Sequence, residues 1–128
     1  MQRRSSSFAA VQFLDRDAVV AALRRLAESL RRADGEVQSV VLFGSIARGD
    51  CGRRSDADLL VLLKRDRDDR RMDRIPEYLP AFLDAPVPVD VLPLTCGELQ
   101  AEIKAGNPFW RRALAEGVLL AGEPVPPA

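Results

Sequence analysis

The chain has 128 residues, the size of one ordinary domain that can bury a single apolar core. Its 19 basic residues balance 19 acidic ones, which argues against the strongly basic surface of a general nucleic-acid-binding protein. Histidine is absent, which excludes histidine-based acid–base or triad chemistry, and two cysteines are too few for a disulfide framework. We therefore expect a single domain over residues 1–128 with reduced thiols, a cytoplasmic location, no membrane span and a frayed proline-rich tail at 124–128.

The first half of the chain begins with an amphipathic pattern. Over residues 17–33, apolar side chains recur at helical spacing with arginines on the other side, which predicts a helix. Residues 37–43 form a short β-branched and apolar run that stops at Gly44, as a buried strand entering a turn does. A short helix can begin at Ser45.

The middle of the chain contains two further apolar segments. Residues 58–63 are continuously hydrophobic, which predicts a central strand with both faces covered. Residues 64–74 mix both charges densely and indicate a solvated loop or a helix start, and residues 78–83 are an ambiguous helix. Valines alternate over residues 87–92, which predicts a third strand. Its Pro88 belongs at the strand start or on a sheet edge, because proline cannot donate to a strand ladder.

The last part of the chain carries clear capping signals. Thr95 can cap a helix that runs to about Lys104, with Glu98 completing a capping box. Another helical turn starts after Pro108, and residues 118–121 are suited to a last short strand. This alternation predicts an α/β fold with a mixed sheet that is covered mainly on one side by helices.

Asp56 and Asp58 open the predicted central strand. Because side chains alternate along a strand, both carboxylates point to the same face, about 7 Å apart. Two other pairs share this spacing but lie in charged or helix-entry segments: Asp15/Asp17 and Asp66/Asp68. Two neighbouring carboxylates repel unless a cation lies between them, and magnesium, which prefers oxygen ligands, suits such a pair.

A third carboxylate on another strand would complete a magnesium site. Asp90 interrupts an otherwise apolar strand, where an uncompensated buried charge would cost several kcal/mol. The alternative, an outward-facing aspartate on a half-exposed strand, stays open for this residue taken alone. Together the three carboxylates are suited to a magnesium-dependent phosphoryl displacement.

The turn after the first predicted strand is suited to binding phosphate. Gly44 allows a phosphate to approach the backbone, and N–H groups and the Ser45 hydroxyl can face it. The alternative is an ordinary strand-to-helix turn with Ser45 as the N-cap. Arg48 can contact phosphate or tie the loop to a carboxylate.

These residues form a recognisable pattern. The segments 42–49 (LFGSIARG) and 55–59 (SDADL) resemble the signature of the DNA polymerase beta-like nucleotidyltransferase superfamily, and in particular its minimal nucleotidyltransferases. Residues 107–120 resemble the usual ending of that family, a helix with Asn and Phe followed by Gly and a short strand. The resemblance implies Mg²⁺, with two ions expected, held by Asp56, Asp58 and Asp90, and a nucleoside triphosphate such as ATP held by Gly44, Ser45, Arg48 and Ser55.

The resemblance implies three functions. In the first, an aspartate helps to deprotonate an acceptor hydroxyl, which attacks the α-phosphorus of the nucleotide and expels pyrophosphate. In the second, the domain is a protein-binding antitoxin paired with a helical HEPN toxin, by contact or by nucleotidylation of that partner. In the third, it modifies small molecules like the aminoglycoside nucleotidyltransferases, although these usually add a substantial helical region.

Several details stay open from the sequence. They are the base preference, the acceptor, and the oligomeric state, including a homo-oligomer. Cys51 has no role in the resemblance. Phe109 and Trp110 can stack on a base, but we expect them to pack the last helix against the sheet rather than to line a site.

Overall fold

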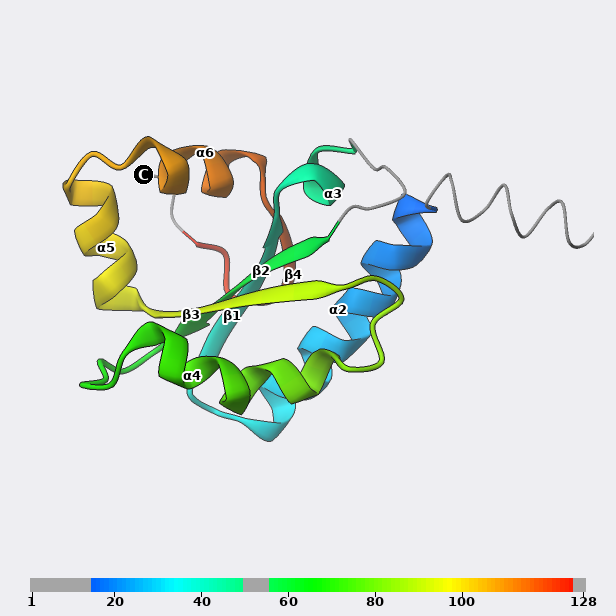
Figure 1. Cartoon of the computed structure of the whole chain (residues 1–128), viewed down its shortest axis with the longest axis horizontal. Coiled ribbons are helices and arrows are strands. Elements are labelled where there is room, and N and C mark those ends of the chain that lie inside the picture. Colours follow the sequence, from blue (N-terminus) through cyan, green and yellow to red (C-terminus); the bar gives the residue numbers. More distant parts are fainter. Residues whose placement is uncertain (1–14, 50–55, 126–128) are drawn as a thin grey trace, which may run out of the picture.

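We describe residues 15–49 and 56–125 of a computed structural model of the whole chain (Figure 1). Within these residues the secondary structure alternates between helices and strands, as the sequence predicts. None of the helices in this part of the chain combines the length and the apolar character needed to cross a membrane.

The described residues contain one mixed sheet with the strand order β3-β2-β1-β4. Its strands are β1 (Val37–Phe43), β2 (Ala57–Leu63), β3 (Val89–Thr95) and β4 (Val118–Gly122). Strand β1 pairs antiparallel with both β2 and β4, whereas β2 and β3 are parallel. The prediction of a central second strand is therefore confirmed, and β3 is an edge strand, which can tolerate Pro93 inside it.

Helices cover both faces of this sheet. The helical elements are α2 (Arg16–Ala33), α3 (Ser45–Arg48), α4 (Arg71–Tyr78), the 3₁₀ turn η1 (Leu79–Phe82), α5 (Cys96–Lys104) and α6 (Pro108–Glu116). In Figure 1, α2 and α4 lie below the sheet and α5 and α6 above it. The α/β fold with a mixed sheet is thus confirmed.

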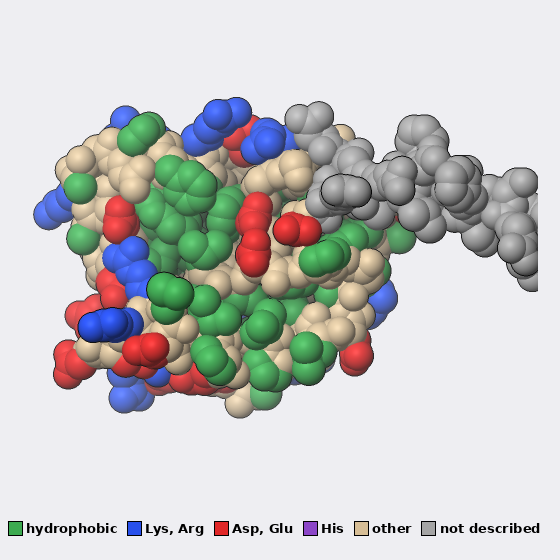
Figure 2. Space-filling view, in the orientation of Figure 1, with side chains coloured by type: hydrophobic (Ala, Val, Ile, Leu, Met, Phe, Trp, Pro, Cys, Tyr) green, Lys and Arg blue, Asp and Glu red, His purple; other side chains and the backbone are tan. Residues whose placement is uncertain are grey.

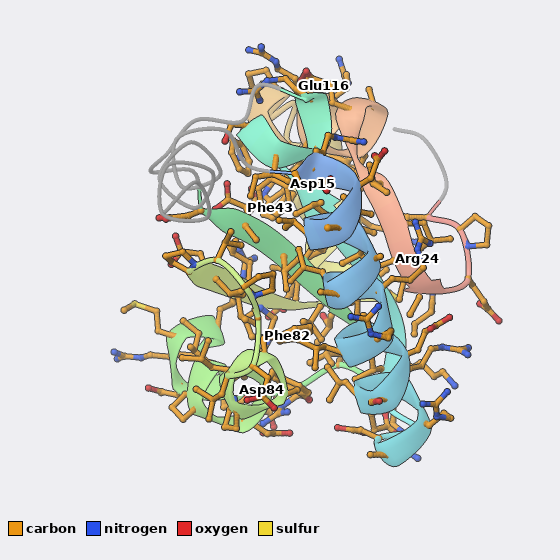
Figure 3. The ribbon with its side chains drawn as sticks, turned by 90° about the vertical axis from the view of Figure 1, so that its right-hand side faces the viewer. Asp15, Arg24, Phe43, Phe82, Asp84 and Glu116 are labelled. Carbon is orange, nitrogen blue, oxygen red and sulfur yellow. The ribbon has the colours of Figure 1, made fainter. Side chains whose placement is uncertain are left out.

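The two layers are unequal. The larger apolar cluster joins α2, for example Leu23, to one face of the sheet and to Phe82 of η1, which lies beside α2 (Figure 3). The smaller cluster joins the opposite face to Leu99 of α5 and Trp110 of α6. The predicted one-sided cover therefore describes the larger layer, and α5 and α6 add a second, thinner one.

The third strand begins later than predicted. Pairing runs from Val89 to Thr95 instead of over residues 87–92, and the Ala57 N–H donates to the Pro88 carbonyl (2.8 Å) just before it. The shift follows the start of β2, because β3 pairs with β2 in register from Ala57 onward. Thr95 ends the strand and caps α5, and the predicted capping box with Glu98 is confirmed.

The charged segment at 64–74 differs from the solvated loop that its composition suggests. Its last residues begin α4, and the Arg74 side chain is completely buried. The Arg74 guanidinium donates to Glu98 (2.7 and 3.0 Å) and to Asp69 (2.8 Å). It also donates to the carbonyl of Pro93 (3.2 Å), so it links α4 and α5 to the edge strand. The charge density of the segment does not indicate this burial, because Glu98 and the Pro93 carbonyl lie 24 and 19 residues away in the sequence.

Candidate functional site

Two carboxylates meet on neighbouring strands at one end of the sheet. The strand register pairs Asp58 with Asp90 on β3 and with Phe43 on β1. Leu60 and Leu92, two residues further along each strand, pack into the α5 and α6 layer, so period two puts both carboxylates on that face. Asp56 lies two residues before Asp58, at the start of β2. Figure 2 shows a group of acidic side chains here, beside an apolar surface.

The electrostatics of this cluster centre on Asp58. Burial raises the pKa of the half-buried Asp58, and the negative charges of Asp90 and Asp56 raise it further, whereas Arg48 lowers it. Asp56 and Asp90 are exposed. Within residues 15–49 and 56–125, no group of three or more acidic or cysteine side chains lies close enough together to hold a metal ion. Magnesium suits this arrangement, because it commonly uses one or two carboxylates and completes its shell with water and phosphate oxygens.

Gly44 brings the turn after β1 against this cluster. Its φ of +83° and ψ of −157° lie in a region that only glycine enters readily. A Cβ at Gly44 would also overlap Oδ2 of Asp58. Gly44, and not Ser45, is the N-cap residue of α3, and Ser45 is the first helical residue. The alternative of Ser45 as the N-cap is therefore wrong, and the backbone at the start of α3 lies next to the Asp58 carboxylate.

A long-range contact holds α3 in place. Arg16 at the start of α2 donates to the carbonyls of Ile46 and Ala47, each at 2.9 Å. These carbonyls belong to the last part of α3, which carries the partial negative charge of a helix end. No local pattern indicates this role for Arg16, because Arg16 and Ile46 are 30 residues apart and come into contact only in the folded chain.

Helix α6 forms the opposite wall of an open pocket of about 380 Å³ beside the cluster. Gly44, Arg48 and Asp58 line one side, and Phe109 with other residues of α6 lines the other. Trp110 is buried, as predicted. Phe109 packs against Phe43 of β1, also as predicted, but it is 51% exposed and lines the pocket as well. Its position one residue from Trp110 on a short helix turns it away from the core.

Arg48 joins the turn to α6. Its Nε lies 3.9 Å from Oε2 of Glu116, and it also acts electrostatically on Asp58. The prediction that Arg48 ties its loop to a carboxylate is therefore confirmed, while its contact with phosphate stays a prediction. Ser55 and Cys51 lie outside the described residues.

The chain matches a known domain family over most of its length. The profile of the nucleotidyltransferase domain family matches residues 23–114, a segment that contains Gly44 and all three aspartates. No curated protein sequence matches the chain.

Several solved structures align with the chain. A candidate nucleotidyltransferase from Sulfolobus solfataricus aligns with a TM-score of 0.58 and 22% identity over 81% of this chain and 80% of that chain. A toxin–antitoxin complex with AMP-PNP aligns with a TM-score of 0.48 and 24% identity over 86% of this chain and 75% of that chain. A tri-AMPylated Shewanella oneidensis HEPN toxin in complex with an MNT antitoxin aligns with a TM-score of 0.48 and 17% identity, over 84% and 73%. The first of these supports the fold.

Proposed function

Because the chain belongs to the nucleotidyltransferase domain family and is a nucleotidyltransferase, we propose that it transfers a nucleoside monophosphate, with ATP as the first candidate donor, to a hydroxyl group of a separate protein. We propose a magnesium-dependent reaction in the cytoplasm. The resemblance described above suggests a HEPN-type helical toxin as the partner, with a tyrosine or another hydroxyl residue as the acceptor.

The observation that carries this proposal is the pairing of Asp58 with Asp90 beside the Gly44 turn. Asp56 and Asp58 would hold the metal ions between them, and Asp90 would join them at the second ion. When bound, magnesium offsets the charge of the triphosphate and of the transition state. Burial and then the negative charges of Asp90 and Asp56 raise the pKa of Asp58, and this supports the assignment because a cation would stabilise the charged carboxylate there.

The protein's own residues then orient the reactants. The backbone at the start of α3, with Ser45 and Arg48, would hold the phosphates. The acceptor hydroxyl gives its proton to one of the aspartates as its oxygen bonds to the α-phosphorus. The bond from the α-phosphorus to the bridging oxygen breaks at the same time, and pyrophosphate leaves. Asp90 is exposed on an edge strand, so an acceptor can approach from the side of β3.

The elements that follow Asp90 support the proposal that a separate protein supplies the acceptor. After Asp90, helices α5 and α6 cover the second face of the sheet with Leu99, Trp110 and Ala113. Strand β4 then pairs with β1. These elements complete the core rather than form an acceptor domain, so within the described residues the acceptor hydroxyl has to come from outside.

The test mixes the chain with ATP, magnesium and a HEPN-type partner, and weighs both proteins by intact-protein mass spectrometry. We expect AMP adducts on the partner with the wild type, and none with Asp56→Asn, Asp58→Asn or Asp90→Asn. Asp66→Asn is the matched control, because Asp66 follows the other end of β2 and lies near Gly97 of α5. Loss of transfer in the control variant, with folding unchanged, would reject the assigned site. Tight neutralising association without any adduct would instead identify a binding module.

A further inference from the structure

Phe109 is an aromatic side chain at the wall of the pocket that packs on two other aromatic rings. Its ring meets Phe43 at a centroid distance of 5.8 Å and Trp110 at 4.9 Å, with interplanar angles of 85° in both pairs. Phe43 is the last residue of β1 and directly precedes Gly44. The ring therefore makes edge-on contacts with two aromatic neighbours, and half of the residue's surface is still exposed. Leu83, another exposed apolar side chain (75%), does not line this pocket.

The same pocket has an apolar wall and a charged rim. Pro108, Phe109 and Ala113 form the apolar wall on α6. At the rim, Glu116 joins two arginines: its Oε1 lies 2.8 Å from Nε of Arg112, and its Oε2 lies 3.9 Å from Nε of Arg48. The volume of about 380 Å³ is within the range of small-molecule sites, roughly 300 to 1,000 Å³.

From this geometry we propose that the pocket binds the nucleobase of the donor nucleotide, with the base stacked on Phe109. The inference rests on the proposed function, because it takes the triphosphate to lie at Gly44 and Asp58. These two residues also line the pocket, so a nucleotide held there by its phosphates has its nucleoside half next to Phe109. A planar base gains from stacking on an aromatic face, and an apolar wall offers it no competing hydrogen bonds.

The pocket also determines which bases bind well. Stacking is tolerant of base identity but grows with ring area, so it favours purines over pyrimidines. The charged side chains among the lining residues in the described part of the chain are Arg48, Arg112, Glu116 and Asp58, and the first three are already joined by ion pairs. The substrate class is therefore a purine nucleoside triphosphate, with ATP and GTP bound similarly and CTP and UTP bound more weakly.

The experiment compares magnesium-ATP with magnesium-tripolyphosphate, which lacks the nucleoside, by calorimetry. We expect Phe109→Ala to weaken ATP binding by about 5- to 100-fold and to leave tripolyphosphate binding unchanged. Phe109→Tyr should retain ATP affinity, and Leu83→Ala is the control for loss of an exposed apolar side chain. The chain has one tryptophan, Trp110, so its fluorescence should change with ATP and much less with tripolyphosphate.

Thermal unfolding of each variant shows whether a loss of ATP affinity comes from lost stacking or from lost folding. If Phe109→Ala unfolds, Phe109→Leu keeps apolar volume without the aromatic face and should still lose ATP affinity. Unchanged ATP affinity in both variants, or equal losses for ATP and tripolyphosphate, would overturn the nucleobase site while leaving the proposed transfer intact. Loss of transfer with normal ATP binding would also overturn it, since the pocket would then serve the acceptor. No ATP binding by the wild type would overturn both proposals.

Discussion

Gly44→Ala tests whether the turn after β1 positions Asp58 in the proposed catalytic site. The substitution forces alanine into a backbone conformation with φ +83° and ψ −157°, which costs about 1 to 3 kcal/mol. The new Cβ would also overlap Oδ2 of Asp58, so the carboxylate has to move. Since a displacement of about 1 Å at a reacting centre can lower a rate by about 100-fold, we expect at least that loss of transfer.

Substitutions at two other glycines distinguish the cost of backbone strain from the displacement of Asp58. Gly106 has a φ of +80°, but nothing lies within 4 Å of a Cβ built there, so Gly106→Ala should cost about 1 to 2 kcal/mol and leave transfer unchanged. Gly35 has neither a positive φ nor a neighbour within 4 Å. Gly35→Ala should therefore be neutral or stabilise the protein by up to about 1 kcal/mol.

The assay measures the free energy of unfolding in urea and the initial rate of AMP transfer for all three variants. Stability should fall in Gly44→Ala and Gly106→Ala, whereas the rate should fall only in Gly44→Ala. The reasoning is refuted if Gly44→Ala transfers at the wild-type rate, or if Gly106→Ala loses transfer to the same degree. Either result would show that the backbone at Gly44 does not determine the position of Asp58.

Three further predictions concern charged side chains. Asp58→Asn should stabilise the metal-free protein at neutral pH, because the raised pKa of Asp58 means that its charged form is disfavoured in the fold. The gain should vanish as pH falls below the ordinary aspartate pKa, and urea unfolding with a chelator measures it; destabilisation at neutral pH would contradict this. Arg74→Ala should lower the free energy of unfolding by about 3 kcal/mol, because the Arg74 side chain is completely buried and paired with Glu98. Arg65 is exposed, so Arg65→Ala should lower it by less than about 1 kcal/mol in the same assay. Equal losses in the two variants would contradict the buried network. Arg16→Ala should lower the free energy of unfolding by about 1 kcal/mol and should weaken ATP binding measured by calorimetry. Arg16→Lys should keep part of the ATP affinity. Unchanged ATP binding in Arg16→Ala would contradict a positioning role for Arg16.

Local patterns in the sequence specify most of the elements. The apolar runs at 37–43 and 58–63 become the two central strands because continuous hydrophobicity requires cover on both faces. Thr95 and Glu98 specify the start of α5, since the capping box needs only residues three apart. Asp66 and Asp68 have the same spacing as Asp56 and Asp58, and only the position of Asp56 and Asp58 at the start of an apolar strand distinguishes the two pairs.

Only the tertiary structure determines the contacts between residues that are distant in sequence. The parallel register that sets Asp90 beside Asp58, the burial of Arg74 and the contact of Arg16 with α3 all depend on strand order and helix docking. The exposure of Phe109 depends on how α6 sits against Phe43. A sequence pattern indicates whether a segment is a helix or a strand and where that segment begins and ends. The pairing of those elements is determined by burying one shared core, which no single segment encodes.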